Sequence, residues 1–249
     1  MTSTGFRVTS DGPVATVTLD RPAQRNAQTP QMWLELAAVG RELSGDTRVV
    51  VLKGEGPSFS AGLDRNAIPA ALGEMSALTP DDAASRIAEY QAAFDWLRRP
   101  DLISVAAVHG HAIGAGFQLA LACDFRVAAE DASFAMAEIT LGLVPDLGGT
   151  RRLLELVGYA RALELCVTGR RVLAHEALAL GLANVVVPVT ELAAATDDLV
   201  AAVLAGNRDA VVEIKALLAS AALRTFGEQE RFEREAQVRR IRDLAGLGE

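Results

Sequence analysis

The residues best placed to do chemistry lie in the stretch VAAVHGHAIGAGFQLALACD, residues 105–124. The apolar run at 102–108 predicts a buried strand, and the chain then breaks at Gly110, Gly114 and Gly116. A helical pattern follows the last glycine. A strand that passes through glycines into a helix leaves backbone N–H groups free at the helix start, where they can bind an anion or a developing oxyanion.

Composition excludes several classes of protein. The spacing of the three glycines does not give the G-x-G-x-x-G of a dinucleotide-binding turn. The 24 Lys and Arg against 32 Asp and Glu give a net charge of −8, so the basic footprint of a nucleic-acid partner is missing. No apolar run reaches the roughly 20 residues of a membrane span, and the N-terminus has no signal-peptide pattern. We therefore expect no membrane partner and a cytoplasmic location.

The cysteines and histidines indicate no metal site. Cys123 and Cys166 both lie in apolar helical surroundings, which favours reduced thiols packed in the core. His109, His111 and His175 have no metal-ligand spacing with cysteines or carboxylates. We expect no metal.

The first half of the chain predicts strands and helices in alternation. Two short strands around residues 11–13 predict a hairpin, and Thr29 with Pro30 predicts the start of a helix. The β-branched run at 49–52 predicts a buried strand of a parallel sheet. Residues 66–82 show no clear period and are interpreted as a flexible apolar loop, a candidate lid over a hydrophobic ligand. Further elements are expected as a helix at 83–99 and strands at 125–128 and 133–135.

The second half is mainly helical, and the whole is typical of α/β architecture. We expect a core unit over residues 1–190, which holds the ligand site, and a helical region over 191–249. The elements expected after Gly148 are helices at 150–157, 160–168, 175–180, 191–205, 209–226 and 228–244, and one strand at 183–187.

Three motifs in matching order resemble the crotonase superfamily of enoyl-CoA hydratases and isomerases. They are FSAGLD at 59–64, the glycine-bordered stretch at 108–124, and EITLGLVPDLGGTRR at 138–152. The likeness runs from about residue 6 to residue 215. It implies an α/β spiral of β-β-α turns and a helical C-terminal region that mediates homotrimers, often paired into hexamers. It also implies an acyl-CoA substrate.

The resemblance implies that two backbone N–H groups hold the thioester oxygen of the substrate. By position they belong to Leu63 and Ala115. Enolising a thioester places negative charge on that oxygen, and one fixed donor of this kind is typically worth about 10²–10³ in rate.

The resemblance also places the adenine-ribose end of CoA. It implies contacts with the loop Ala23, Gln24 and Arg25, and with the turn that includes Ala61 and Asp64. A guanidinium matches phosphate geometry, so Arg25 is a candidate partner of a CoA phosphate; an exposed loop arginine is the alternative. CoA is part of the substrate, and no separate cofactor is expected.

The carboxylates decide which reaction is favoured. Family hydratases use two glutamates; Gln118 stands at the first position, and an amide cannot act as a base, whereas Glu138 matches the second. A single carboxylate suffices to move a proton from C2 to C4 of a 3-enoyl thioester. We therefore expect an isomerase with Glu138 as base and Gln118 positioning substrate or water. Asp146 is a candidate second acid/base or a charge that tunes Glu138, and it is also a candidate N-cap of the next helix; these roles do not exclude one another.

Two other functions remain open. A hydratase (a lyase) of fatty-acid β-oxidation, in which Asp146 replaces the missing glutamate, is the first alternative. A non-catalytic acyl-CoA-binding protein is the second, suggested by the loss of that glutamate. Dienoyl-CoA isomerases share an aspartate where this chain has Asp146, but they also carry one where it has Gln118.

Overall fold

Apolar, β-branched segments build the larger of two sheets in the computed structural model, which describes residues 5–248. The first two strands form an antiparallel hairpin, as predicted, and every later neighbour is parallel. In spatial order the strands are β1 (Phe6–Asp11), β2 (Val14–Leu19), β3 (Val49–Gly54), β4 (Ile103–Val108), β6 (Phe125–Ala129) and β9 (Val185–Val187). The smaller sheet contains β5 (His111–Ile113), β7 (Ser133–Ala135) and β8 (Val172–Leu173).

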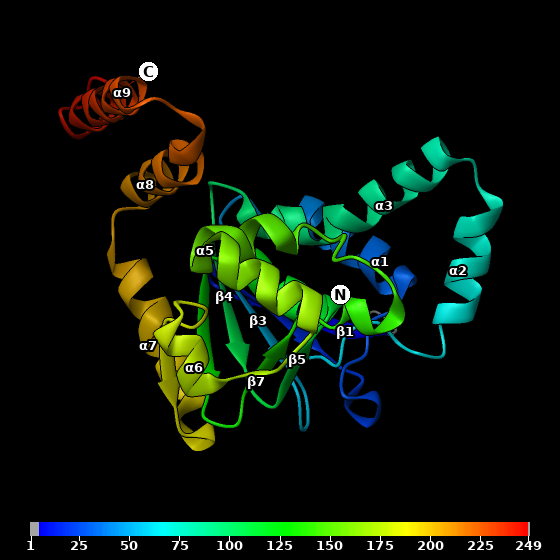
Figure 1. Ribbon diagram of the computed structural model, residues 1–249. Helices are drawn as coiled ribbons and strands as arrows, with labels where there is room; N and C mark the ends of the chain where they lie inside the picture. Colours follow the sequence, from blue (N-terminus) through cyan, green and yellow to red (C-terminus); the bar gives the residue numbers. More distant parts are fainter. Residues whose placement is uncertain (1–4, 249) are drawn as a thin grey trace.

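The helices lie around these sheets (Figure 1). They are α1 (Pro30–Glu42), α2 (Ile68–Ala77), α3 (Pro80–Asp95), α4 (Ala115–Ala122), α5 (Gly149–Thr168), α6 (Ala174–Ala179), α7 (Leu192–Ala205), α8 (Arg208–Ser220) and α9 (Phe226–Leu244). Thr29 caps α1 through its side chain, with Pro30 as the first helical residue, as predicted. Gly158 has φ 74° inside α5, so the expected break in this helix is confirmed.

The chain advances as a spiral of β-β-α turns. Each turn places a strand in the larger sheet, then a short extended segment in the second layer, then a helix. The strands β4 and β5 with α4 form one turn, and β6 and β7 with α5 form the next. In the preceding turns the second layer consists of isolated bridges, which pair Gln28 with Leu63 and Ser60 with Ala112. The expected α/β fold is confirmed.

Alternate residues of the central strands face opposite sides of the larger sheet, and both sides are covered. Val50 and Leu52 pack into the main core, which also includes the side chains of α1, α3 and α4. Val49 and Val51 face the other side, where α7 packs against β3, β4 and β6. The strand β4 is buried along its whole length, so it holds the start of α4 in a fixed place.

The prediction of a flexible loop at 66–82 is wrong. The structure has α2 there, and α3 begins within the same segment at Pro80, with Thr79 as its side-chain cap. None of the residues of α2 is buried, so the sequence carries no apolar stripe of helical period. Likewise, the single helix expected at 209–226 ends at Ser220, and α9 begins at Phe226.

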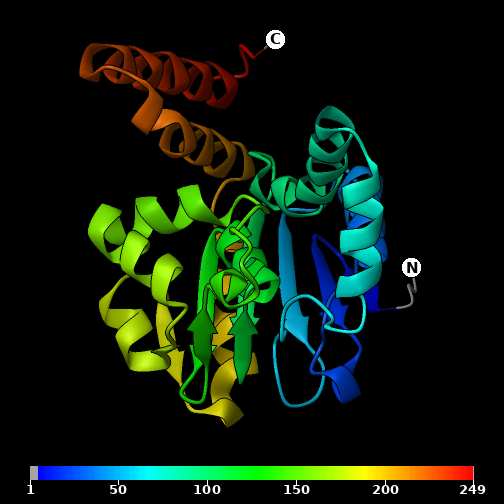
Figure 2. The same cartoon turned by 45° about the vertical axis from the view of Figure 1, so that its right-hand side comes forward.

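The last two helices, α8 and α9, project from the body of the molecule (Figures 1 and 2). Lys215 is the one buried residue of α8, and its Nζ donates to the Leu102 carbonyl and to Asp124 Oδ2, both at 2.7 Å. Apolar side chains on these helices, including Leu218, Phe226 and Leu244, are more than two-thirds exposed. Within residues 5–248, no helix is both long and apolar enough to cross a membrane.

Candidate active site

The two backbone N–H groups named above lie beside each other and are unpaired. The bridge to Gln28 uses the Gly62 carbonyl and the Asp64 N–H, so it leaves the Leu63 N–H free. Ala115 is the first residue of α4, where an N–H has no partner within the helix. Among the residues described, neither the Leu63 N–H nor the Ala115 N–H donates a hydrogen bond to the protein.

Glycines allow these two segments to approach. Gly62 has φ 85°, and a Cβ there would collide with the Ile113 carbonyl and lie 3.4 Å from the Ala115 nitrogen. Gly114 has φ 52°, and a Cβ there would lie 3.3 Å from Glu138 Oε1. Both positions therefore require glycine, for the left-handed backbone and for the space. The two N–H groups and the Glu138 carboxylate are thus immediate neighbours.

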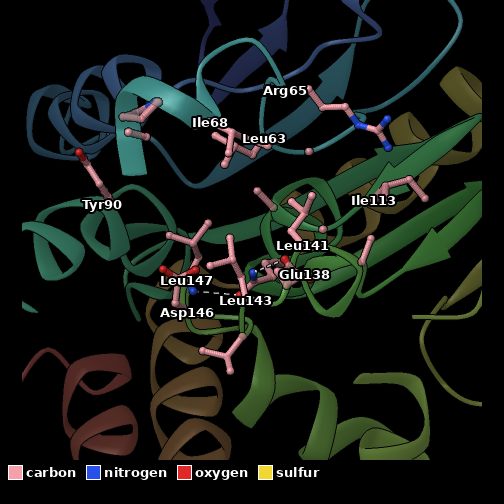
Figure 3. A pocket seen from close by; sticks show the side chains of 18 of the residues that line it. Leu63, Arg65, Ile68, Tyr90, Ile113, Glu138, Leu141, Leu143, Asp146 and Leu147 are labelled. Carbon is pink, nitrogen blue, oxygen red and sulfur yellow. Dashed lines mark hydrogen bonds between the residues drawn. The ribbon is translucent and has the colours of Figure 1, made fainter. Parts of the chain in front are cut away.

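An apolar cavity of about 400 Å³ opens over this point. Glu138 and Asp146 lie on one side of it, and Leu63 and Ile68 lie across from them (Figure 3). Helices α2 and α3 and the 141–147 segment supply much of the apolar wall, through Ile68, Leu72, Met75, Ile87, Leu143 and Val144. Part of the segment that the sequence indicated as a candidate lid is therefore a helix, α2, in the wall of the cavity, and its role as a lid stays a prediction.

Glu138 has the features of a base. Its Oε1 accepts a hydrogen bond from Gln118 Nε2 at 2.7 Å, whereas its Oε2 is buried and has no partner among residues 5–248. Burial raises the pKa of Glu138, and the charge of Asp146 raises it further. A buried carboxylate with one unbonded oxygen and a raised pKa is suited to take up and release a proton.

Asp146 does not cap the following helix. The N-cap of α5 is Gly148, which has no side-chain cap, so the N-cap alternative is wrong. Burial raises the pKa of Asp146, and no side chain in the described part of the chain donates to its carboxylate. The Asp146 backbone carbonyl accepts from Gln91 Nε2 of α3 at 2.6 Å. Asp146 therefore presents to the cavity a carboxyl group that has no side-chain partner within residues 5–248.

Gln118 is 1% exposed and connects the two carboxyl-bearing segments. Its Nε2 donates to Glu138, and its Oε1 accepts from the backbone N–H groups of Leu147 at 2.9 Å and Gly149 at 3.2 Å. All three predicted catalytic positions thus come together on one side of the cavity.

A second cavity, of about 480 Å³, adjoins the first. The two share Ala61, Leu63, Arg65 and Ile113 as wall residues, which makes them parts of one elongated site. Arg25, Gln24 and Asp64 line the second cavity, as expected from the sequence, whereas Ala23 lines neither cavity.

Asp64 is occupied by a structural contact. Its Oδ2 accepts from Arg21 at 2.8 Å, its Oδ1 accepts from the Asn66 N–H, and the residue is 8% exposed. The Arg21 guanidinium and the Asn66 N–H hold the pKa of Asp64 below its ordinary value. The Asp64 charge is therefore balanced, and the surplus charge of the second cavity is positive.

The sequence missed three cationic or polar residues of the second cavity. Arg65 follows the FSAGLD motif directly, and this adjacency was a usable signal. Arg171 and His111 come together only through the pairing of β7 with its neighbours on either side. Arg171 Nη1 donates to Ser133 Oγ at 3.1 Å and lies 3.3 Å from His111 Nδ1. No local sequence pattern predicts these contacts.

Comparison with known proteins gives one consistent result. The family model for enoyl-CoA hydratase/isomerase matches residues 9–243. The carnitinyl-CoA dehydratase of Salmonella enteritidis PT4 is 42% identical over 193 residues, which are 76% of this chain and 70% of that protein.

Solved structures agree with the sequence match. A Thermobifida fusca YX protein in complex with acetoacetyl-CoA is 47% identical, with a TM-score of 0.91, over 96% of this chain and 95% of that one. An enoyl-CoA hydratase from Polaromonas sp. JS666 is 34% identical, with a TM-score of 0.81, over 94% of this chain and 90% of that one.

Proposed function

The chain belongs to the enoyl-CoA hydratase/isomerase family, which acts on CoA thioesters, and we propose that it isomerises 3-enoyl-CoA to 2-enoyl-CoA. The observation that carries the proposal is the single unpaired oxygen of Glu138 beside two unpaired N–H groups. One mobile proton and one stabilised oxyanion are all that this reaction requires.

In the proposed mechanism, the Glu138 carboxylate takes a proton from C2 of the 3-enoyl thioester. The electron pair moves toward the thioester oxygen, which accepts hydrogen bonds from the Leu63 and Ala115 N–H groups. The resulting dienolate is protonated at C4 by the same carboxyl group, which returns Glu138 to its charged form. No atom is gained or lost, and the double bond ends in conjugation with the carbonyl.

Hydration of 2-enoyl-CoA is the alternative that a specific observation favours. Asp146 has a carboxyl group without a side-chain partner, and it lies close enough to raise the pKa of Glu138. In that mechanism the two carboxyl groups hold a water molecule against C3, and Asp146 replaces the glutamate absent at position 118.

Rates with matched substrates test the proposal. The purified protein should convert 3-enoyl-CoA to 2-enoyl-CoA faster than it hydrates 2-enoyl-CoA of the same chain length. Faster hydration would assign the hydratase function instead. Tight binding of both esters, without turnover and without exchange of the C2 proton into deuterated water, would identify a non-catalytic acyl-CoA-binding protein.

The second cavity is assigned to the phosphates of CoA. Arg25 and Arg65 have no ion-pair partner in the part of the chain that the structure describes, and Arg171 lies across the same cavity. Each charge-assisted contact with a phosphate is worth roughly tenfold or more in affinity. Ala61 and Asp64 form the turn between the two cavities.

Replacing both arginines should weaken the binding of the CoA end alone. We expect the double variant Arg25→Ala with Arg65→Ala to raise KM for the acyl-CoA by about 10- to 100-fold, with kcat little changed. The N-acetylcysteamine thioester of the same acyl group, which lacks phosphates, is the matched control, and its KM should not move. An equal rise for both substrates would contradict a phosphate role.

The assembly proposed for the chain is a homotrimer or a pair of trimers formed through α8 and α9. The exposed Leu218, Phe226 and Leu244 on these projecting helices support it, because exposed apolar groups of this density favour association. Sedimentation equilibrium of the purified protein measures the mass that decides the matter. A cytoplasmic location stays a prediction from the sequence, based on the missing signal-peptide pattern and the two cysteines.

A further inference from the structure

The side chain of Gln118 forms nearly all of its possible hydrogen bonds with other groups of the protein. Its Oε1 accepts two backbone N–H groups, those of Leu147 and Gly149, and an amide oxygen has two lone pairs to offer. One of its two Nε2 hydrogens goes to Glu138 Oε1. A Cβ at Gly149 would lie 2.7 Å from Gln118 Cγ, so the contact depends on glycine there.

We propose that Gln118 is a positioning residue that fixes Glu138 through Oε1, leaves Oε2 without a protein partner, and ties Glu138 to the segment that carries Asp146. This inference deepens the proposed function and depends on Glu138 being the base. Within residues 5–248, the hydrogen-bond partners of Gln118 are thus Glu138, Leu147 and Gly149, and the positioning of substrate or water by Gln118 stays a prediction.

An amide suits this position better than a carboxylate. Glutamate at 118 would keep the two backbone contacts but would place a second negative charge 2.7 Å from Glu138. Because Gln118 Oε1 is saturated, it cannot also accept a hydrogen bond from an attacking water. The arrangement therefore serves transfer of a proton to and from the substrate, and it gives no second base at this position.

The hydrogen bond also sets the proton affinity of Glu138. A donor to a carboxylate favours the charged form, so Gln118 lowers the pKa that burial and Asp146 raise. The other titratable group that faces Glu138 is Cys166 of α5, whose thiol has its pKa raised by burial and by the Glu138 charge. A neutral thiol does not change the charge balance at Glu138 near neutral pH.

Gln91 provides a matched control. Its Nε2 holds the Asp146 carbonyl from the side of α3, so Gln91 and Gln118 restrain the same segment from two directions. Only Gln118 contacts Glu138. Loosening the segment through Gln91→Met acts on Glu138 only through the position of the Asp146 charge, so it should change the pKa of Glu138 much less than Gln118→Met does.

The test is a pH titration of the ligand-free protein by carbon-13 NMR of the glutamate side chains. The Glu138 signal is identified by its absence in Glu138→Gln. In Gln118→Met the titration of Glu138 should move to higher pH by about one pH unit. Gln118→Glu should move it further, as a coupled pair of carboxyls, and Gln91→Met should move it far less than either. The acid limb of kcat/KM should follow the same order.

Each outcome separates the inference from the function on which it rests. An unchanged Glu138 titration in both Gln118 variants, or an equal shift in Gln91→Met, would overturn the positioning role. If Gln118→Met fails to fold, Gln118→Glu, which keeps both backbone contacts, carries the test alone. A shifted titration in a protein that does not isomerise 3-enoyl-CoA would leave Gln118 as the positioning residue and remove the isomerase function.

Discussion

Glu138→Gln should lower kcat for isomerisation of 3-enoyl-CoA by about 10³-fold, within the range of general acid–base catalysis. The amide keeps the shape of the side chain but cannot accept the C2 proton, and no other carboxylate contacts Gln118 and the Gly114 turn in the described chain. KM should change little, because the cavity wall and the cationic end of the site are untouched. Steady-state kinetics with saturating 3-enoyl-CoA measure the effect.

Asp146→Asn is the companion variant. Removing the Asp146 charge lowers the pKa of Glu138, since a like charge disfavours the ionised form. Glu138 then stays charged to lower pH, so the acid limb of kcat/KM should move down in pH while most of the activity remains. A loss in Asp146→Asn as large as that in Glu138→Gln would indicate two obligatory carboxyls and favour hydration. Activity retained in Glu138→Gln would remove the assigned base.

Ala115→Pro should lower kcat by roughly 10²- to 10³-fold, since it deletes one of the two oxyanion donors. Proline fits the first position of a helix, where the N–H has no partner within the helix, and Ala115 is the first residue of α4. The substitution therefore removes a donor with little change to the helix. The measurement is kcat, and the thermal midpoint of unfolding of the same variant checks that its fold is intact.

Ala115→Ser is the matched control, because it changes the side chain and keeps the N–H. It should lose far less activity than Ala115→Pro. Equal kcat for the two variants, with both folded, would show that the Ala115 N–H does not stabilise the transition state. A lowered thermal midpoint confined to Ala115→Pro would point to strain at Gly114, which precedes it with φ 52°.

The sequence predicted those elements of the site for which the hydrophobic pattern and the local residue chemistry agree. The apolar run before Gly110 is β4, and the helical pattern after Gly116 is α4. The intervening β5 was missed because three residues between glycines show no period; His111–Ile113 becomes a strand only by pairing with β7. Short strands of this kind are set by tertiary contacts and leave little local signal.

The sequence also failed to predict helix α2, but for a different reason. Half of its residues are Ala, Leu or Met, which form helices readily, but none of its residues is buried, so no apolar stripe marks the helix. Thr79 with Pro80 repeats the cap signal of Thr29 with Pro30 and was a usable sign of α3.

The site, likewise, could be predicted from the sequence only in part. Glu138 and Asp146 were predicted through the resemblance, and the fold brings them to one cavity. The contacts that define their chemistry were not accessible from sequence. Gln91, on α3, reaches a segment 55 residues later, and the bond from Gln118 to Gly149 spans 31 residues. Such pairs depend on how helices pack, which a single sequence does not encode locally.

The exposure of α2 bears on how acyl preference evolves in this chain. The helix supplies Ile68, Leu72 and Met75 to the wall opposite Glu138, yet it contributes no residue to the folded core. Substitutions at such positions cost little stability. The α2 wall can therefore change in sequence, and with it the acyl chain length or branching that the cavity fits. Glu138 and Asp146 on the other wall need not change with it.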